Sequence, residues 1–344
     1  MTLGCPGPYH EDEVVLLGHG AGGRLTAELL DRLVLPALGV GGGPLEDAAL
    51  LPGHPDLVIS TDSFVVSPLF FPGGDIGSLA VHGTVNDLAM RGAWPLALSV
   101  SLIVEEGLPL AELRSVTQSL GKAAQAAGVP VVTGDTKVVG RGAADRLFVN
   151  TTGVGRRHPL LRPSAALARP GDAVLLSGPV GLHGTTVLST RDGLGFDTDI
   201  ASDSRPLHQL VAGLAPLGEA VRVLRDPTRG GLAAALNEIA RDSSVAVEIE
   251  EAAVPVPRAV ASACDLLGLD PLVVANEGCL VAFVAAGSAD AALAALRSRP
   301  EGRSAVRIGT VLAKGPGGRV TVRTLVGALR IVEMPLGEQL PRIC

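Results

Sequence analysis

Residues 57–91 read LVISTDSFVVSPLFFPGGDIGSLAVHGTVNDLAMR, and this stretch predicts a strand, a loop and a helix in succession. The apolar run at its start has the length of a strand, proline and glycine interrupt the sequence that follows, and helical sequence begins at about Ile76. Asp62 ends the strand and Asp87 lies in the helix. We therefore expect an α/β unit that carries carboxylates close to where its elements end.

The same alternation of strands and helices continues on both sides of this stretch. Before it, we predict a short strand at 14–17, a glycine-rich loop GHGAGG and an amphipathic helix at 24–35. After it, we predict strands at 97–104, 129–135, 147–155, 173–177, 245–249, 279–285, 307–312 and 319–324. We predict helices at 109–128, 207–214, 232–241, 258–267 and 289–298. Residues 178–184 are predicted to form a glycine-rich turn. Such alternation favours an α/β (α+β) architecture.

The stretch at 156–172 is rich in proline and arginine and is a linker candidate. It divides the chain into a loose lead at 1–13, an N-terminal domain at 14–156, a C-terminal α/β domain at 157–332 and a mobile tail at 333–344. The lead has no cationic segment followed by an apolar one, and no window reaches about 18 uninterrupted apolar residues. We therefore expect neither a signal peptide nor a membrane span, and a cytoplasmic location.

Composition disfavours several classes of protein. Of the 344 residues, 47% are hydrophobic, which is enough for a buried core. The net charge is −7 and the 28 lysines and arginines form no basic run, so we do not expect nucleic-acid binding. Only 2% of the residues are aromatic, which leaves little material for stacking on bases. The four cysteines, among them Cys5, show no CxxC spacing, so we expect neither a metal finger nor a disulfide framework.

Five aspartates lie beside predicted turns: Asp47, Asp62, Asp87, Asp135 and Asp226. Carboxylates at strand ends and helix starts meet at the rim of an α/β sheet, where such folds bind ligands. Hard oxygen ligands without His or Cys partners favour Mg²⁺, and Mg²⁺ usually accompanies the phosphates of a nucleotide. Any one aspartate could instead cap a helix or form a turn, but five together favour the ligand-binding interpretation.

Gly18, Gly20 and Gly23 form a GxGxxG pattern between a predicted strand and a predicted helix, which raises the alternative of a dinucleotide-binding fold. That fold needs a second strand that ends in an acid about twenty residues later, whereas residues 36–44 are a Gly/Pro-rich loop. The sequence also contains no GxxxxGK[ST] phosphate loop. The glycines still suit a loop whose backbone N–H groups approach phosphate, so we assign Gly20, Gly22 and Gly23 to nucleotide binding.

Three further residues are candidates for chemistry. Lys137 follows Asp135 in a predicted polar turn, although it could be an ordinary surface lysine. Glu277 lies in a turn between two apolar runs and could equally cap that turn. Cys344 is the last residue and follows EMPLGEQLPRI, which has no periodicity, so its thiol is free to travel; the alternative is an inert surface or buried thiol.

Eight motifs carry a resemblance to a known family: GHGAGG (18–23), EDAALL (46–51), TDSFVVSPLFFPGGDIG (61–77), VHGTVNDLAM (81–90), VTGDTKVV (132–139), DPTRGGLAAALNEIA (226–240), ANEG (275–278) and PRIC (341–344). Together they resemble the HypE family of hydrogenase expression/formation proteins over nearly the whole chain. The wider superfamily includes aminoimidazole ribonucleotide synthetase, selenophosphate synthetase and thiamine-monophosphate kinase, which resemble this chain in the aspartates of the ATP site. The PRIC motif separates the HypE family from these relatives.

The resemblance implies a two-domain PurM-like fold, with N-terminal domains that pair into a β-barrel in a homodimer, a C-terminal α/β sandwich and a flexible tail. It implies ATP and Mg²⁺ at the domain and subunit junction. The carbamoyltransferase HypF would carbamoylate Cys344, and ATP-dependent dehydration would convert this group to a protein-bound thiocyanate. The HypC and HypD complex would then receive the cyanide for the iron of the [NiFe]-hydrogenase centre.

The resemblance also assigns roles to individual residues. Cys344 carries the carbamoyl group, Glu277 is the general base, and Lys137 orients it or relays the proton. The family motifs assign Asp62, Asp87 and Asp226 to the metal, and Asp47, Asp62, Asp135, His82, Asn86 and Thr228 to the nucleotide pocket. Two alternatives stay open: a small-molecule kinase or ligase of the same superfamily, and a non-catalytic scaffold that presents its tail to a partner.

Overall fold

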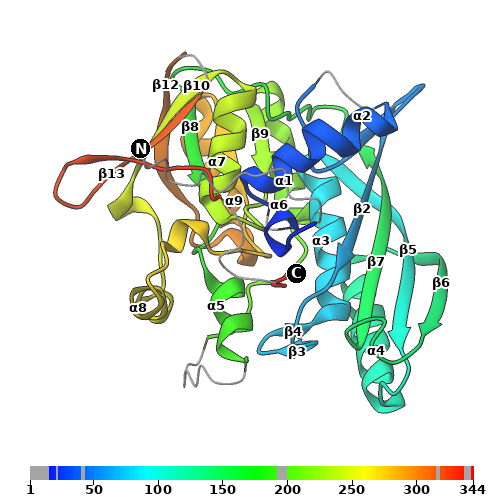
Figure 1. The fold of residues 1–344 in the computed structure, drawn as a ribbon. Coiled ribbons are helices and arrows are strands. Elements are labelled where there is room, and N and C mark those ends of the chain that lie inside the picture. Colours follow the sequence, from blue (N-terminus) through cyan, green and yellow to red (C-terminus); the bar gives the residue numbers. More distant parts are fainter. Residues whose placement is uncertain (1–14, 21, 40–42, 192–199, 315–317, 337–341) are drawn as a thin grey trace.

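The computed structural model describes residues 15–20, 22–39, 43–191, 200–314, 318–336 and 342–344. A five-stranded sheet forms in the N-terminal half and a seven-stranded sheet in the C-terminal half, and the C-terminus lies between them (Figure 1). The predicted lead at 1–13, which includes Cys5, lies outside the described residues.

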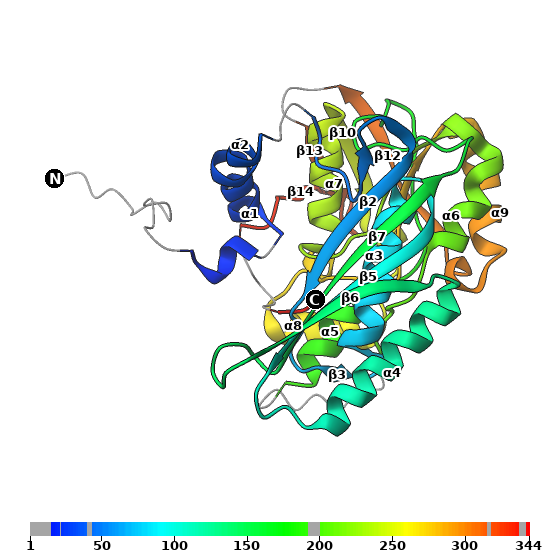
Figure 2. The same ribbon diagram turned by 90° about the vertical axis from the view of Figure 1, so that its right-hand side faces the viewer.

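The N-terminal sheet has the strand order β1-β2-β7-β5-β6. Its strands are β1 (Ala49–Leu51), β2 (His54–Phe64), β5 (Ala93–Glu105), β6 (Val131–Val139) and β7 (Leu147–Arg157). β5 and β6 pair in parallel, and the other neighbours pair antiparallel. Two helices, α3 (Ile76–Met90) and α4 (Leu110–Ala127), pack together on one face of this sheet (Figure 2), and the hairpin of β3 (Phe70–Phe71) and β4 (Gly74–Asp75) leads into α3.

The helix that carries Asp87 begins at a capping box. Asp75 Oδ1 accepts hydrogen bonds from the backbone N–H groups of Gly77 (2.7 Å) and Ser78 (3.0 Å). Ser78 Oγ accepts one in return from the backbone N–H of Asp75 (3.0 Å). A cap of this kind stabilises a helix by about 1 kcal/mol. A Cβ at Gly77 would overlap the backbone oxygen of Val116, so glycine is what lets α4 pack this closely on α3.

The C-terminal sheet has the strand order β14-β13-β10-β12-β8-β11-β9. Its strands are β8 (Ala173–Leu176), β9 (Val221–Arg225), β10 (Val245–Glu250), β11 (Val281–Val284), β12 (Val306–Lys314), β13 (Arg319–Arg323) and β14 (Leu329–Ile331). Its helices are α5 (Leu182–Ser189), α6 (His208–Leu214), α7 (Gly231–Asp242), α8 (Arg258–Leu267) and α9 (Ala289–Arg297), with short 3₁₀ helices at Ala215–Ala220, Glu251–Ala253, Pro271–Val273, Ala286–Ser288 and Pro300–Gly302.

Both faces of this sheet are buried. Val174 and Leu176 of β8 pack into a core with α7, whereas Ala173 and Leu175 pack into a second core with α6 and α9. A strand that is buried on both faces reads as a continuous apolar run, and the sequence AVLL of β8 follows that rule.

Most predicted helices and strands are present close to their expected bounds, but the predicted strand at 14–17 is wrong over its described part. Val15 and Leu16 have no regular structure, and Leu17–Gly20 form a 3₁₀ helix. This apolar run is not hydrogen-bonded to any strand of the two sheets, which is why its β-like composition forms none. The predicted helix at 24–35 is confirmed as a succession of α1 (Arg24–Leu29), a π-helical segment (Leu30–Val34) and α2 (Leu35–Leu38).

Two further predictions of local structure are wrong. The glycine-rich turn predicted at 178–184 contains the start of α5, whose residues His183, Thr185 and Thr186 are buried. Tertiary packing thus stabilises a helix that local composition does not favour. The polar turn predicted around Lys137 is part of β6, which continues to Val139.

Among the described residues, Cys264, Cys279 and Cys344 are free and buried. Within the same part of the chain, we find no helix with both the length and the apolar character that crossing a membrane requires.

Candidate nucleotide and metal site

Three carboxylates from different parts of the chain meet between the two sheets. Asp47 precedes β1, Asp87 lies on α3 and Asp226 follows β9, and each offers an oxygen atom within 4.8 Å of the others. Three hard oxygen ligands at this spacing suit one Mg²⁺ ion, with the remaining positions left for water and phosphate. Of the predicted metal ligands Asp62, Asp87 and Asp226, the last two belong to this cluster. Asp47, predicted for the nucleotide pocket, is its third member, and Asp62 is not part of it, although its charge raises the pKa of Asp87.

Burial and mutual repulsion make this cluster unfavourable without a cation. Burial raises the pKa of Asp47 to about 8 and that of Asp226 to about 6, and it holds the pKa of Asp87 well above its usual range. The neighbouring carboxylates raise these pKa values further. Asp47 Oδ2 is buried and has no hydrogen-bond partner among the described residues. A divalent cation would supply the missing partner and offset the repulsion.

Side chains around the cluster hold it in place. Arg225 Nε lies 3.0 Å from Asp47 Oδ1, and Arg225 Nη2 lies 2.6 Å from Glu238 Oε2. Ser60 Oγ lies 2.5 Å from Asp87 Oδ2 and 3.1 Å from the backbone oxygen of Asp47. Ser60 of β2 therefore links Asp47 and Asp87, and the position of Asp226 is set by β9, which it directly follows.

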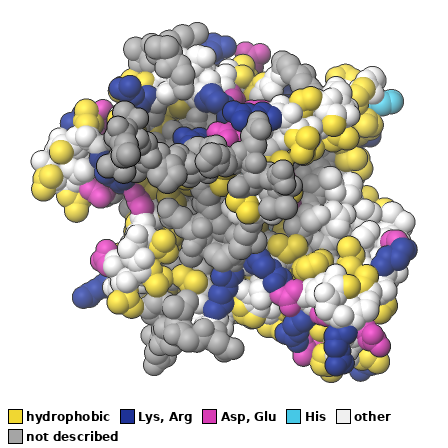
Figure 3. Space-filling view, viewed as in Figure 1, with side chains coloured by type: hydrophobic (Ala, Val, Ile, Leu, Met, Phe, Trp, Pro, Cys, Tyr) yellow, Lys and Arg dark blue, Asp and Glu magenta, His cyan; other side chains and the backbone are white. Residues whose placement is uncertain are grey.

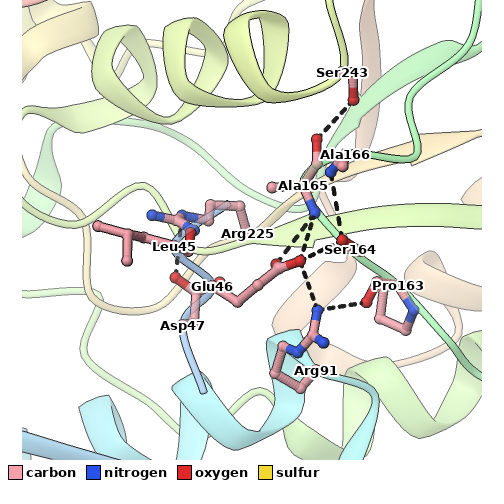
Figure 4. Close-up of polar contacts among 10 residues, drawn as sticks. All are labelled: Leu45, Glu46, Asp47, Arg91, Pro163, Ser164, Ala165, Ala166, Arg225 and Ser243. Carbon is pink, nitrogen blue, oxygen red and sulfur yellow. Dashed lines mark hydrogen bonds and ion pairs between the residues drawn. The ribbon is translucent and has the colours of Figure 1, made fainter. Parts of the chain in front are cut away.

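The residue before Asp47 ties the two halves of the chain together (Figure 4). Glu46 Oε1 lies 2.9 Å from Arg91 Nη1, at the end of α3, and also accepts hydrogen bonds from Ser164 Oγ and the N–H of Ala165. Arg91 Nη1 also donates to the backbone oxygen of Pro163 (2.8 Å). This network connects the loop of Asp47, the helix of Asp87 and the segment that leads to β8.

A cavity of about 520 Å³ opens beside the carboxylates. Its walls come from α1, from α7 and from the turn between β9 and α7, and they include Gly22, Gly23, Asp47, Asp226 and Thr228. Basic and acidic side chains are neighbours on this side of the molecule (Figure 3). The volume is that of a typical ligand site, and the N-terminal end of α7 favours an anion there. The cavity therefore suits a ligand that carries phosphate groups, and of the residues predicted to bind the nucleotide it is lined by Gly22, Gly23, Asp47 and Thr228.

The glycine-rich loop must approach the cavity wall closely. Gly22 has φ +74°, and a Cβ there would lie 2.7 Å from Cβ of Arg229. Its backbone N–H donates to Thr26 Oγ1 in α1 (3.0 Å). Gly20 lies in the preceding 3₁₀ helix with open space around it. Close packing against Arg229 therefore requires glycine at position 22, whereas the space around position 20 does not require glycine there.

His82 and Asn86 connect the two halves of the chain. His82 Nδ1 lies 2.9 Å from Ser204 Oγ, and burial lowers the pKa of His82 to about 4, so the ring is neutral. Asn86 Oδ1 accepts from the N–H of Leu207 (2.7 Å), and Asn86 Nδ2 donates to the backbone oxygen of Arg205 (3.1 Å). Both side chains bind the 204–207 segment, and neither is among the residues that line the cavity.

Glu277 is a buried acid next to the cluster. Only 2% of the residue is exposed, and burial followed by the charge of Asp226 raises the pKa of Glu277 well above its usual range. Its Oε1 has no hydrogen-bond partner within the described ranges. Asp203 positions the loop by accepting from the N–H groups of Glu277 (3.1 Å) and Gly278 (3.0 Å). Because its pKa is raised, the carboxylate form of Glu277 is a stronger base than an exposed carboxylate and suits the removal of a proton from a substrate.

Lys137 and Asp135 lie elsewhere in this protomer. Both are on β6, where Lys137 Nζ lies 2.5 Å from Asp135 Oδ2 and the two side chains are 68% and 57% exposed. The hydrogen bond from Lys137 lowers the pKa of Asp135. The structure thus separates these two residues from the cavity, which neither of them lines.

Arg229 is a site residue that the sequence analysis missed. Negative charge on Cys344 is the main reason why the pKa of Arg229 is raised, and Asp62 and Glu277 act in the same direction. Cys344 itself is only 8% exposed. Arg229 follows Thr228, which was predicted for the nucleotide pocket, but nothing in the local sequence distinguishes Arg229 from the other arginines of the chain. The structure therefore places the last residue of the chain next to the acidic site.

The chain is similar to known protein families and to characterised proteins. The family described as AIR synthase related protein, N-terminal domain, matches residues 45–157, and the corresponding C-terminal domain family matches residues 169–322. A carbamoyl dehydratase HypE from Cupriavidus necator is 55% identical over 331 residues, which cover 95% of this chain and 94% of that protein.

Solved structures show the same similarity. The crystal structure of hydrogenase maturation protein HypE in complex with ATP matches with a TM-score of 0.81 and 50% identity, and the match covers 96% of this chain and 100% of that chain. The crystal structure of a HypE–HypF complex matches with a TM-score of 0.83 and 46% identity, over 91% of this chain and 100% of that chain.

Proposed function

The chain belongs to the HypE family of carbamoyl dehydratases, and from that premise we propose that it uses ATP to dehydrate a carbamoyl group on the sulfur of Cys344 to a thiocyanate. One observation carries the proposal: Cys344 is only 8% exposed, and its backbone oxygen accepts a hydrogen bond (3.1 Å) from the N–H of Val65, three residues after Asp62. The negative charge of Cys344 also raises the pKa of Arg229, which lines the cavity. A carrier thiol is therefore docked where a nucleotide and its metal would bind.

ATP would occupy the 520 Å³ cavity. A relative of 50% identity has been solved with ATP, and this chain has a cavity of suitable size beside its acidic cluster. Gly22 and Gly23 supply backbone that can approach phosphate, and Thr228 and Arg229 also line the cavity. Arg229 would also attract the negative charge of the phosphates.

Mg²⁺ would be held by Asp47, Asp87 and Asp226. Their oxygen atoms meet within 4.8 Å, and the buried Oδ2 of Asp47 lacks a partner among the described residues, so the donor set fits a hard cation. When bound, the ion would neutralise charge on the phosphates of ATP.

The reaction needs a leaving group and two bases. The carbamoyl oxygen bonds to the γ-phosphorus of ATP and releases ADP, which turns a poor leaving group into phosphate. The C–O bond then breaks with its electron pair leaving on phosphate, and the two protons on nitrogen pass to bases, which leaves S–C≡N. We assign one proton to Glu277, because burial makes its carboxylate a stronger base. The docked position also limits the access of water to the intermediate.

Lys137 would contribute to the site in a homodimer. Apolar side chains such as Ile59, Ile103 and Val138 are exposed on the N-terminal sheet, which fits pairing of two such sheets in a dimer. β6, which carries Lys137 and Asp135, is an edge strand of this sheet. We propose that both residues act in the assembled dimer, where Lys137 orients the base or relays its proton.

The partners follow from the family. Because a relative forms a solved complex with HypF, we propose that HypF delivers the carbamoyl group to Cys344. The complex of HypC and HypD would receive the cyanide for the iron of the [NiFe]-hydrogenase centre.

The test is a mass measurement on the tail. The protein is carbamoylated with HypF, MgATP is added, and intact mass and the C-terminal peptide are followed. We expect the loss of one water on that peptide, dependent on ATP and abolished in Cys344→Ala. A loss of water that persists in Cys344→Ala, or no loss in the carbamoylated wild type, would contradict the proposal.

A further inference from the structure

The last three residues of the chain are held by backbone pairing. The N–H of Val65 donates to the backbone oxygen of Cys344 (3.1 Å), and the N–H of Ser67 donates to the backbone oxygen of Arg342 (3.2 Å). Residues 65–67 follow β2, the strand that carries Asp62. This pairing fixes the direction and register of the tail but is independent of its side chains.

Side-chain recognition comes from Arg342. Its guanidinium forms an ion pair with Asp145, its Nε donates to the backbone oxygen of Val65 (2.9 Å), and its Cζ lies 5.9 Å from the centre of the Phe148 ring. Arg342 has φ +52°, a left-handed conformation that is unfavourable for a residue other than glycine. The contacts of the side chain offset that cost.

Two side chains from the C-terminal half of the chain, His183 and Arg191, hydrogen-bond the backbone of residues 342 and 343. His183 Nε2–H donates to the backbone oxygen of Ile343 (2.9 Å), and His183 Nδ1 accepts from Ser202 Oγ (2.8 Å). Burial lowers the pKa of His183 to about 4, so the ring is neutral, as this pair of bonds requires. Arg191 donates from Nη2 to the backbone oxygen of Arg342 (3.0 Å) and from Nε to that of Ser67 (3.0 Å).

The side chains of the last two residues, Ile343 and Cys344, are buried. Ile343 is 3% exposed and Cys344 8% exposed, and both belong to an apolar core that includes Val66 and Val187. Ile343 therefore anchors the tail in the protein interior, and the bond from Val65 places Cys344 directly after the strand of Asp62, where its negative charge raises the pKa of Arg229.

We propose that residues 65–67, Asp145, Phe148, His183 and Arg191 form a docking site that reads the Arg-Ile-Cys sequence of the tail and positions the sulfur of Cys344 for reaction. Asp145 and Phe148 select the arginine, the apolar core selects the isoleucine, and His183 and Arg191 hold the backbone between them. The inference rests on the proposed function for its purpose, while the docking itself can be measured without it. These residues are positioning residues, because they act through the placement of Cys344.

The docked tail shields its thiol, so the rate of Cys344 alkylation by iodoacetamide reports docking in the native, full-length protein. In Asp145→Asn we expect this rate, measured on the C-terminal peptide by mass spectrometry, to rise about three- to fivefold, the range for a partly exposed ion pair. Arg342→Gln also loses the contacts with Val65 and Phe148, and we expect an increase on the order of tenfold. Glu112→Gln, which removes an ion pair with Arg146 on the neighbouring loop, is the matched control and leaves the rate unchanged.

A double-mutant cycle separates docking from a general loss of structure. If Asp145 acts through Arg342, the double variant is alkylated no faster than Arg342→Gln alone, and Arg342→Lys is closer to the wild type than Arg342→Gln is. Unchanged alkylation in Asp145→Asn and Arg342→Gln, or effects of the two that add, would overturn the proposal. Alkylation needs neither ATP nor HypF, so a failed dehydration assay with the expected alkylation rates would refute the proposed function and leave the docking site standing.

Discussion

Glu46 and Arg91 form a buried ion pair, 2.9 Å between Oε1 and Nη1, with side chains that are only 14% and 9% exposed. Glu46 is the residue before Asp47, and Arg91 follows Asp87 by four residues at the end of α3. One ion pair thus joins the two backbone segments that carry two of the three clustered carboxylates. The position of these carboxylates depends on a contact that has no part in binding a ligand.

Removal of the Glu46 carboxylate should therefore damage both stability and metal binding. We expect Glu46→Ala to lower the free energy of unfolding by about 3 kcal/mol, because Arg91 stays buried without its partner. Urea unfolding measures this loss, and calorimetry with Mg²⁺ and ATP should show weaker binding in the folded variant. Asp56→Ala, which removes an exposed ion pair with Arg162 (3.9 Å), is the control and should change stability by no more than about 0.5 kcal/mol. Equal effects of the two substitutions would contradict this view of Glu46.

The acidic cluster makes a second prediction about the cation. In wild-type protein, Mg²⁺ with ATP at a hundredfold excess over Kd should stabilise the fold by about 3 kcal/mol, seen as a rise in Tm. Asp87→Asn should lose most of this rise, yet be at least as stable as the wild type in EDTA, because it removes one of three repelling carboxylates. Asp265→Asn, an exposed residue of α8, should keep the full rise. An unchanged rise in Asp87→Asn would place the metal elsewhere.

Regular local patterns made much of this fold predictable. α4 and α8 have apolar residues on one face and end at Gly128 and Gly268, which adopt φ +69° and +67° as helix C-caps commonly do. The aspartates could be assigned to one rim because strand ends and helix starts of an α/β fold converge there, and Asp47, Asp87 and Asp226 do meet.

The remaining features depend on contacts between distant segments. α5 forms because tertiary packing buries it, although its eight residues include a glycine and three β-branched residues. His183 binds the backbone oxygen of Ile343, 160 positions away, and the pKa of Arg229 responds to the charge of Cys344 at the far end of the chain, so no local pattern marks either residue. Lys137 was expected beside Glu277, but it is exposed on β6 because this strand runs four residues beyond the predicted end at residue 135.

The raised pKa of Glu277 predicts how dehydration depends on pH. A general base must be deprotonated, and burial raises the pKa of Glu277 well above its usual range. The single-turnover rate of the carbamoylated protein should therefore continue to increase with pH above the range in which an ordinary carboxyl titrates. Glu277→Gln should be slower by about 100-fold or more and should lose this dependence. Glu106→Gln, an exposed acid, should keep the wild-type profile, and a wild-type profile in Glu277→Gln would assign the base to another group.

The glycine-rich loop offers the last prediction, because two of its glycines lie in opposite surroundings. Gly22→Ala places a Cβ 2.7 Å from Cβ of Arg229 and at φ +74°, so we expect a loss of about 1–3 kcal/mol in stability and weaker ATP binding. Gly20→Ala has open space around it and should bind ATP as the wild type does. Because Arg229 also faces Cys344, Gly22→Ala should speed the alkylation of that thiol in the absence of nucleotide. Calorimetry and alkylation on the two variants check this prediction. Equal ATP affinities and equal alkylation rates of the two variants would mean that the close packing of Gly22 against Arg229 does not affect the cavity.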